Sequence, residues 1–304
     1  FFKCIQKMIW FDLIQKIVLL FLTGSGILGN VLIFVRHVRT LVVGPERKPI
    51  DLILINLTFS NTIITCHTGI IYVAAVFSFG NFLSDAGCKT AVYLSRMARG
   101  LSICTTCLLC MVQAVTISPS TTLWRKLKPQ TAWQVLPHLF LFWVLNSLIS
   151  SNLLHYITAG SSVNRSGVGM YTGYCYMLPP RHIIKWLFLS LMTLRDAIFQ
   201  TVMGWSSGSM ALHLYKHHKR VLYLHSSRFV NNSSPEIRAA QSTLILMACF
   251  LCFYWADFIF SFYMGSTLVQ CSIMLIIKSF LGTGYAALSP FVLISREGCG
   301  AKSC

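Results

Sequence analysis

Residues 17–35 read IVLLFLTGSGILGNVLIFV, an apolar run that contains no Asp, Glu, Lys or Arg. A helix rises about 1.5 Å per residue, so roughly 20 apolar residues are enough to cross about 30 Å of hydrocarbon. The run is too long for a cleavable signal peptide and lacks a small-residue cleavage site. We therefore expect it to be a membrane span that serves as its own insertion signal.

Six further apolar runs follow. The predicted spans are Ile17–Val35, Leu52–Phe77, Thr90–Ile117, Ala132–Leu154, Ile183–Leu212, Ala239–Tyr263 and Leu268–Ile294. The 304 residues are 55% hydrophobic and only 11% charged, with a mean hydropathy of +0.66, whereas soluble domains carry about 25% charged residues. The sequence thus predicts an all-α membrane protein, a seven-transmembrane-helix bundle.

The formal net charge of +17 has a topological explanation. Lys and Arg are concentrated in the loops after the first, third and fifth predicted spans and recur in the tail, which is the positive-inside pattern. A nucleic-acid-binding protein gathers its cations on one soluble face instead, so we expect no nucleic-acid partner. We predict an extracellular segment at 1–16, a membrane domain at 17–294 and a short cytoplasmic tail at 295–304.

Two of the twelve cysteines are well placed for a disulfide on the outer side. Cys88 lies at the outer mouth of the third span and Cys175 in the long outer loop, where an oxidising compartment favours a bridge. Such a bridge would limit the conformations of a lid over the bundle. In the same loop, Asn164 begins an N-glycosylation sequon, Asn-Arg-Ser.

Ionised side chains inside a bilayer cost about 2.5–3.5 kcal/mol each, so each one needs a partner or a water-filled cavity. Arg96 and Arg99 share one side of the third span, about 12–16 Å below its outer end. One interpretation is that they meet an anionic group of a ligand. The alternative is that Asp257, Asp196 or helix carbonyls satisfy them.

Asp257 and Lys278 lie at similar depths on the sixth and seventh spans, which permits an ion pair between them. A structural pair is favoured over direct ligand contact. Arg195 and Asp196 are adjacent and so point about 100° apart, which predicts a partner on another helix for each. The spacing of Cys104, Cys107 and Cys110 resembles a metal site, but in an apolar helix we expect buried small hydrophobes and no metal.

Prolines mark possible irregularities. Ser289-Pro290 removes one backbone hydrogen bond from the seventh span and predicts a kink near its cytosolic end, and Pro137 predicts another in the fourth span. The fifth span continues into a basic helix after Tyr215, a surface that attracts anionic lipid headgroups. A sharp helix start is predicted at Ser234-Pro235-Glu236.

Several strings make the sequence similar to the vomeronasal type-1 receptors, a pheromone receptor family of G-protein-coupled receptors. They are LSRMARGLSICTTCLLC at 94–110, TISP at 116–119, DLIL at 51–54, NLT at 56–58, HHKRV at 217–221, SPEIRAA at 234–240 and SPFVLI at 289–294. The similarity extends from about Gly26 to Ser295. The sequence departs from the wider rhodopsin-like receptor pattern at Val112-Gln113-Ala114, at Asn61 and at Ser289.

The resemblance implies a chemosensory receptor of the plasma membrane that detects pheromones or steroid-like small molecules and activates an inhibitory-class G protein. Some members respond to sulfated steroids, which would suit Arg96 and Arg99. We expect no enzymatic activity, because Asp196 and Asp257 are the only deep carboxylates and neither lies in a recognisable catalytic string, and we expect no cofactor. The ligand-binding candidates are Arg96, Arg99, Asp257 and Lys278. The candidates for the G-protein-facing surface are Lys216, His217, His218, Lys219, Arg220 and Arg238.

Two other classes of protein fit the sequence less well. In a retinal-binding opsin, Lys278 would carry the Schiff base and Asp257 would be its counterion, but Lys278 precedes Ser289 by about three turns where opsins place the lysine about two turns before the proline motif. A small-molecule transporter would show internal repeats with broken helices in corresponding positions, which the sequence lacks.

Overall fold

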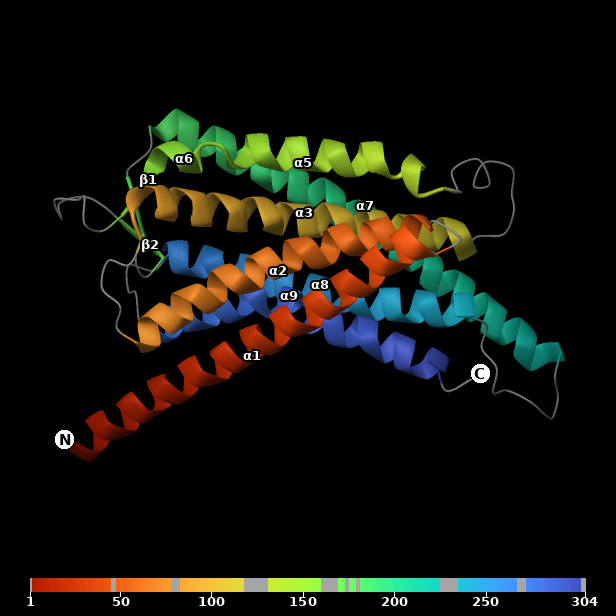
Figure 1. Ribbon diagram of the computed structural model, residues 1–304, viewed down its shortest axis with the longest axis horizontal. Coiled ribbons are helices and arrows are strands. Elements are labelled where there is room, and N and C mark those ends of the chain that lie inside the picture. The colour runs from red at the N-terminus through yellow and green to blue at the C-terminus, as the bar shows by residue number, and fades with distance from the viewer. Residues whose placement is uncertain are drawn as a thin grey trace.

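The computed structural model is a bundle of long helices with a small β-sheet at one end (Figure 1). It describes residues 2–44, 48–77, 83–117, 131–159, 169–172, 175–178, 181–224, 235–266 and 272–301. The helices are α1 (Phe2–Val43), α2 (Pro49–Val76), α3 (Asp85–Ile117), the short 3-10 helix η1 (Ala132–Gln134), α5 (Leu136–Ser150), α6 (Leu153–Tyr156), α7 (His182–Leu224), α8 (Pro235–Ser266) and α9 (Ser272–Ala301). The strands are β1 (Ile157–Ala159), β2 (Gly169–Thr172) and β3 (Cys175–Met177).

The helices confirm the prediction of a largely helical membrane protein. Four segments of the described chain are long and apolar enough to cross a membrane, namely Lys16–Val43, Pro49–Ala74, Asp85–Ile117 and Ala132–Tyr156. Leu244–Asp257 and Ser279–Ile294 are shorter apolar helical stretches. The small sheet was not predicted, since its strands have only three or four residues each.

Several helices extend beyond the predicted spans. Helix α1 begins at Phe2, so the segment predicted at 1–16 is helical from that residue onward, and α9 continues to Ala301 through most of the predicted tail. Helix α7 continues to Leu224, as predicted for the basic helix after the fifth span. Hydropathy detects the part of a helix suited to hydrocarbon, whereas the backbone hydrogen-bond ladder continues past it.

The two prolines have different effects. The predicted kink at Pro137 is wrong, because this residue lies in the first turn of α5, where a missing backbone N–H leaves no ladder bond unmade. The interruption in that segment comes instead at 151–152, between α5 and α6. Pro290 lies inside α9, which remains helical on both sides of it.

Helix α3 is the centre of the bundle. It contacts α2, α5, α7 and α8, and its inward residues are almost completely buried. Cys104, Cys107 and Cys110 are among them, and each is buried as a small hydrophobe, as predicted. The position of α3 means that any polar side chain on it must find its partner within the bundle.

Buried amides and hydroxyls join the helices. Asn61 of α2 donates from Nδ2 to Ser289 Oγ of α9 at 2.9 Å, and it accepts a bond from Ser102 Oγ of α3 at 2.8 Å. Asn30 of α1 donates to the carbonyl of Ala286 of α9 at 2.9 Å. Such interhelical hydrogen bonds, which average about 0.6 kcal/mol in membranes, fix which helix faces meet.

The sheet has the strand order β1-β3-β2 and is antiparallel throughout. Its middle strand begins at Cys175, which forms the predicted disulfide with Cys88 of α3, with the Cα atoms 5.7 Å apart. The backbone N–H of Ala159 in β1 also donates to Asp85 Oδ1, at 3.1 Å. The sheet is thus tied to the first turn of α3 by a covalent bond and a hydrogen bond.

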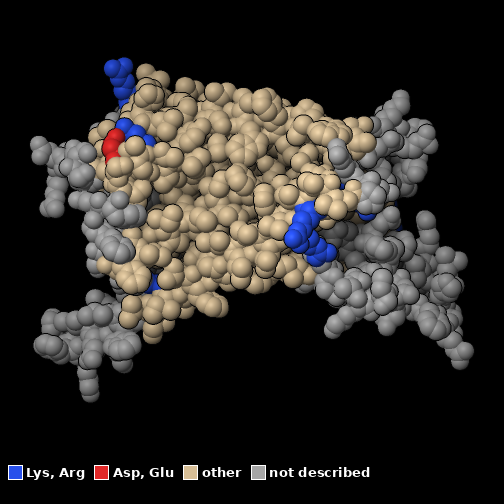
Figure 2. All heavy atoms as spheres, viewed as in Figure 1, with Lys and Arg blue, Asp and Glu red and all other residues tan. Residues whose placement is uncertain are grey.

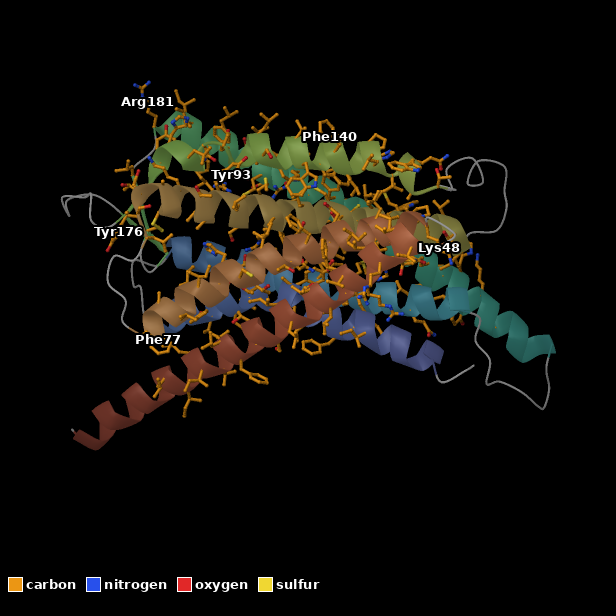
Figure 3. All side chains as sticks on the ribbon, in the orientation of Figure 1. Lys48, Phe77, Tyr93, Phe140, Tyr176 and Arg181 are labelled. Atoms are coloured by element: carbon orange, nitrogen blue, oxygen red, sulfur yellow. A yellow bond between two sulfur atoms is a disulfide. The ribbon has the colours of Figure 1, made fainter. Side chains whose placement is uncertain are left out.

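The two ends of the bundle differ from its middle. In Figure 2 the charged side chains of the visible described surface lie toward the two ends, and other residue types cover the band between them. In Figure 3, Phe77, Tyr176 and Arg181 lie at the end that carries the sheet, here called the sheet end, and Lys48 lies at the opposite end. Phe140 points outward from α5 and is 69% exposed, as expected for a side chain that faces lipid.

Candidate ligand site

An ion pair joins α3 to α8 inside the bundle. Arg99 Nη2 lies 2.6 Å from Asp257 Oδ2, and Asp257 is only 8% exposed. Of the two interpretations that the sequence left open for Arg99, this contact matches pairing with Asp257. A buried charge without a partner would cost several kcal/mol, so the pair fixes the relative rotation of the two helices.

A second buried ion pair lies within α7. Arg195 Nη2 lies 2.6 Å from Asp196 Oδ1, and the two residues are 6% and 7% exposed. The prediction of partners on other helices was incomplete, because the long guanidinium reaches back to its neighbour. Each residue also has the expected outside partner: Arg195 donates to Asn146 Oδ1 of α5 at 2.6 Å, and the Tyr254 hydroxyl of α8 donates to Asp196 Oδ2.

Arg96 is half-buried and has a different environment from Arg99. Its Nη2 lies 3.2 Å from the Met192 thioether sulfur of α7, and within the described ranges no carboxylate pairs with it. A thioether is a weak acceptor that does not neutralise a cation. The two arginines therefore have different partners: Arg99 has a carboxylate counterion, whereas the described contact of Arg96 is with a neutral side chain.

The predicted pair between Asp257 and Lys278 has no support in the described contacts. Lys278 lies on α9, but its side chain is outside the part that the structure describes. Among the described contacts, the Oδ2 atom of Asp257 is bound by Arg99.

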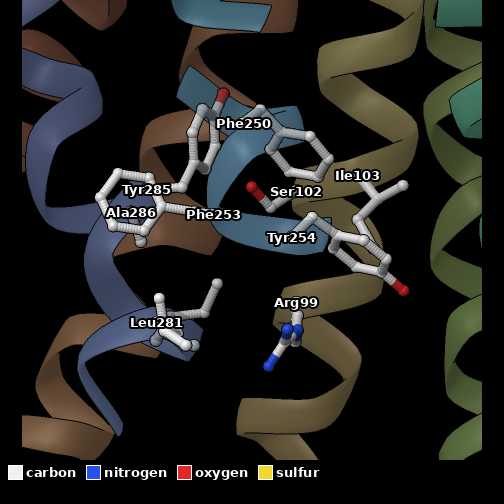
Figure 4. A pocket seen from close by; sticks show the side chains of 11 residues that line it. Arg99, Ser102, Ile103, Phe250, Phe253, Tyr254, Leu281, Tyr285 and Ala286 are labelled. Atoms are coloured by element: carbon white, nitrogen blue, oxygen red, sulfur yellow. The ribbon is translucent and has the colours of Figure 1, made fainter. Parts of the chain in front are cut away.

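A small cavity lies beside Arg99, between α2, α3, α8 and α9 (Figure 4). Its lining combines aromatic and small residues: Ile64, Arg99, Ser102, Ile103, Phe250, Phe253, Tyr254, Leu281, Gly282, Tyr285 and Ala286. The cavity volume is about 20 Å³, which is room for about one water molecule. The state described is therefore closed toward any larger molecule.

The polar groups at the cavity differ in how well they are satisfied. The Tyr285 hydroxyl is 2.9 Å from Thr106 Oγ1, so it has a partner. Asp257 Oδ1 is buried and has no hydrogen-bond partner within the described part of the chain. A Cβ atom on Gly282 would lie 3.2 Å from Arg99 Nη1 and 3.8 Å from this oxygen, so α9 passes close to the ion pair at this residue.

The sequence reasoning missed the residues that surround the ion pair. Tyr254, Phe250 and Asn146 were not singled out, although Phe250, Tyr254 and Asp257 follow one another at spacings of four and three residues on one face of α8. That spacing was the available signal. Asn146 had no comparable signal, because its role depends on contacts with α7 that sequence distance does not indicate.

The opposite end of the bundle carries the predicted cytosolic surface. Lys216 and Lys219 are exposed near the end of α7. His217, His218, Arg220 and Arg238 lie on α7 and α8, but their side chains are outside the described part. The predicted glycosylation site, Asn164, also lies outside the described residues.

A bundle of apolar helices with paired charges at mid-depth, aromatic cavity walls and a disulfide-tied sheet over one end is typical of a helical membrane receptor. Comparison with known proteins gives the particular family: the model of the vomeronasal organ pheromone receptor family, type 1, matches residues 13–302. The chain belongs to this family, as the sequence strings predicted.

Individual relatives agree with the family match. Human vomeronasal type-1 receptor 4 is 30% identical over 93% of this chain and 94% of its own length. Mouse vomeronasal type-1 receptor 50 is 30% identical over 93% of this chain and 91% of its own length. Rat vomeronasal type-1 receptor 92 is 30% identical over 93% of this chain and 92% of its own length.

Proposed function

We propose that this chain is a chemosensory receptor that binds a small molecule beside the Arg99–Asp257 pair and activates a G protein at the opposite end of the bundle. The observation that carries the proposal is an ion pair at mid-depth beside an aromatic-walled cavity. Ionisable residues inside a membrane bundle mark functional sites by default, and such pockets are where small molecules bind. Membership of a pheromone receptor family supports the same conclusion.

The proposed topology has seven spans, an extracellular N-terminus and a cytoplasmic C-terminus. Seven of the described helices have 15 or more residues, namely α1, α2, α3, α5, α7, α8 and α9. In Figure 1 they pack together, with α1 crossing obliquely and its N-terminal part extending away from the others. The disulfide supports an extracellular sheet end, because disulfides persist in oxidising compartments. The basic residues at the opposite end support a cytosolic location for that end.

The charge inventory of the proposed site favours a ligand with an anionic group. The described cations at this depth are Arg96, Arg99 and Arg195, whereas the described acids are Asp196 and Asp257. Two ion pairs use both acids and leave one of these cations, Arg96. An anionic small molecule would supply its counter-charge, and a steroid-like body would suit the aromatic walls of the cavity beside Arg99, three residues further along α3.

Binding requires the cavity to expand, because ligand pockets in proteins measure about 300–1,000 Å³. The walls formed by α8 and α9 are the candidates for this movement. They approach each other closely at Gly284, where a Cβ atom would collide with the cavity-lining Phe253 of α8, and α9 contains Pro290 one turn beyond the cavity-lining Ala286. A movement of α9 at Pro290 would transmit the expansion of the cavity to the end of the bundle opposite the sheet.

The proposed G protein is of the inhibitory class, by kinship with the family. Its binding surface would include the exposed Lys216 and Lys219 near the end of α7. A basic surface complements the acidic side chains of a partner and speeds its docking. The same surface would contact anionic lipid headgroups, and Asn164 would carry a glycan on the other side.

The test is a reporter assay in cells that express the full chain with a G protein chimera. Cells would be exposed to sulfated steroids, matched neutral steroids and volatile odorants, with untransfected cells as the control. The proposal predicts a concentration-dependent response that requires the chain and is selective for sulfated steroids. A correctly surface-expressed chain that responds to none of the three classes would refute it.

A further inference from the structure

Tyr254 of α8 touches both buried ion pairs. Its hydroxyl donates to Asp196 Oδ2 of the pair within α7, and its ring lies under the Arg99 guanidinium of the other pair, with Arg99 Cζ 5.6 Å from the ring centroid. In Figure 4 the ring lines the cavity near Arg99, and the hydroxyl points away from Leu281 and Tyr285. One side chain therefore connects a polar cluster on α5 and α7 to the cavity.

The cluster behind Tyr254 is held in place by several hydrogen bonds. Asp196 accepts from Arg195 Nε at 2.8 Å as well as from Nη2, and Arg195 Nη1 donates to Asn146 at 2.6 Å. Asn146 in turn donates to its own helix at the carbonyl of Phe142, at 2.8 Å. A fully hydrogen-bonded buried network holds its members in one arrangement.

Glycine at position 100 of α3 permits this cluster. A Cβ atom there would collide with Asn146 Oδ1 and with Arg195 Nη1. The two side chains therefore lie directly against the α3 backbone, one residue after Arg99. Gly100 lies in the same turn of α3 as Arg99 and Ser102, which line the cavity, so the cluster and the cavity contact neighbouring residues of one helix.

The ring contact constrains Arg99. A guanidinium over an aromatic face is attracted by the ring electrons, and the attraction depends on its position over the ring. Asp257 binds one edge of the same guanidinium, at 2.6 Å. The orientation of the Tyr254 ring, fixed by its hydroxyl, therefore selects the position from which Arg99 meets Asp257.

We propose that Tyr254 is a positioning residue of the ligand site, which orients the Arg99–Asp257 pair because Asp196 holds its hydroxyl. This inference rests on the proposed function for its role in ligand recognition. The inference also predicts a coupling between the Tyr254 hydroxyl and the Arg99–Asp257 pair, which the hydroxyl does not touch. This coupling does not require a ligand.

A double-mutant cycle on the purified full chain in detergent micelles tests this coupling without a ligand. Apparent unfolding temperatures are measured for Tyr254→Phe, Asp257→Asn and the combination. Tyr285→Phe, alone and with Asp257→Asn, is the matched control, because it removes a second buried tyrosine hydroxyl from the same cavity, one that bonds to Thr106. If Asp257→Asn does not fold, Arg99→Lys replaces it, since lysine keeps the charge and loses the planar guanidinium.

The expected result is non-additivity of about 2 °C or more between Tyr254→Phe and Asp257→Asn, and additivity within about 1 °C for the control cycle. Additivity in both cycles, or equal coupling in both, would overturn the inference. In the reporter assay, Tyr254→Phe is expected to raise the half-maximal concentration of a sulfated steroid about tenfold at unchanged maximal response. Thermal coupling in a chain that responds to no cue would support the inference and refute the proposed function, so the two failures are distinguishable.

Discussion

Replacing Asp257 by asparagine is expected to destabilise the protein, because Arg99 then keeps its charge and loses its carboxylate. Removing one partner of a buried ion pair costs about 3–5 kcal/mol. The Arg99 side chain is 36% exposed while that of Asp257 is 11% exposed, so water screens part of the loss. We expect a loss of about 1–3 kcal/mol in the free energy of unfolding.

Thermal unfolding of the purified chain measures this loss. About 2–4 °C is expected per kcal/mol for chains of 150–250 residues, so Asp257→Asn should lower the unfolding temperature by about 2–12 °C. Asp85→Asn is the matched control, since Asp85 pairs with Lys89 at 2.8 Å but the two side chains are 41% and 34% exposed. An exposed pair contributes less than about 1 kcal/mol, so the control should change little.

A compensating variant identifies the cause. Arg99→Gln combined with Asp257→Asn removes both charges, so it should recover part of the stability lost by Asp257→Asn alone. The reasoning is refuted if Asp257→Asn is no less stable than Asp85→Asn. It is also refuted if the double variant is less stable than the single one.

Three further outcomes follow from the structure. Gly100→Ala should lower the unfolding temperature by several degrees, because its Cβ atom collides with Asn146. Gly204→Ala is the control and should not, because nothing lies within 4 Å of the added atom. Equal unfolding temperatures for the two variants would contradict this. Cys88→Ser should reduce cell-surface labelling strongly, because the disulfide joins residues that are 87 apart in the sequence. Closing such a loop stabilises the folded state by about 4–5 kcal/mol on the chain-entropy model. Labelling at the wild-type level would contradict this prediction. Lys219→Glu should slow agonist-stimulated nucleotide exchange by an added G protein without changing the unfolding temperature, and unchanged exchange would exclude Lys219 from the proposed surface.

The sequence predicted the helices well because hydropathy and proline have local effects. The run at 17–35 lies within α1, and the start of α8 at Pro235 was predicted from three residues. The disulfide was predictable too, since Cys88 was placed by the outer end of the third span and Cys175 by the outer loop that faces it. The extensions of α1 and α9 beyond the predicted spans were not predictable, because hydropathy does not indicate where a helix ends outside the apolar region.

The partners of the buried charges were only partly predictable. Depth along a helix can be counted from its end, and this count gave both Arg99 and Lys278 as possible partners of Asp257. The choice depends on how the helices rotate about their axes, which is set by contacts such as that between Asn61 and Ser289. Those contacts join residues far apart in the chain, and their pairing has no local signature.

The most direct test of the proposed ligand site is the concentration dependence of the reporter response to a sulfated steroid in cells that express wild-type chain, Arg96→Gln or Arg181→Gln. Arg181 is exposed at the sheet end and serves as the matched control. We predict that Arg96→Gln raises the half-maximal concentration about tenfold or more, while Arg181→Gln does not, because Arg96 alone among the described mid-depth cations has no carboxylate partner. Equal potency for all three proteins, at equal surface expression, would contradict it.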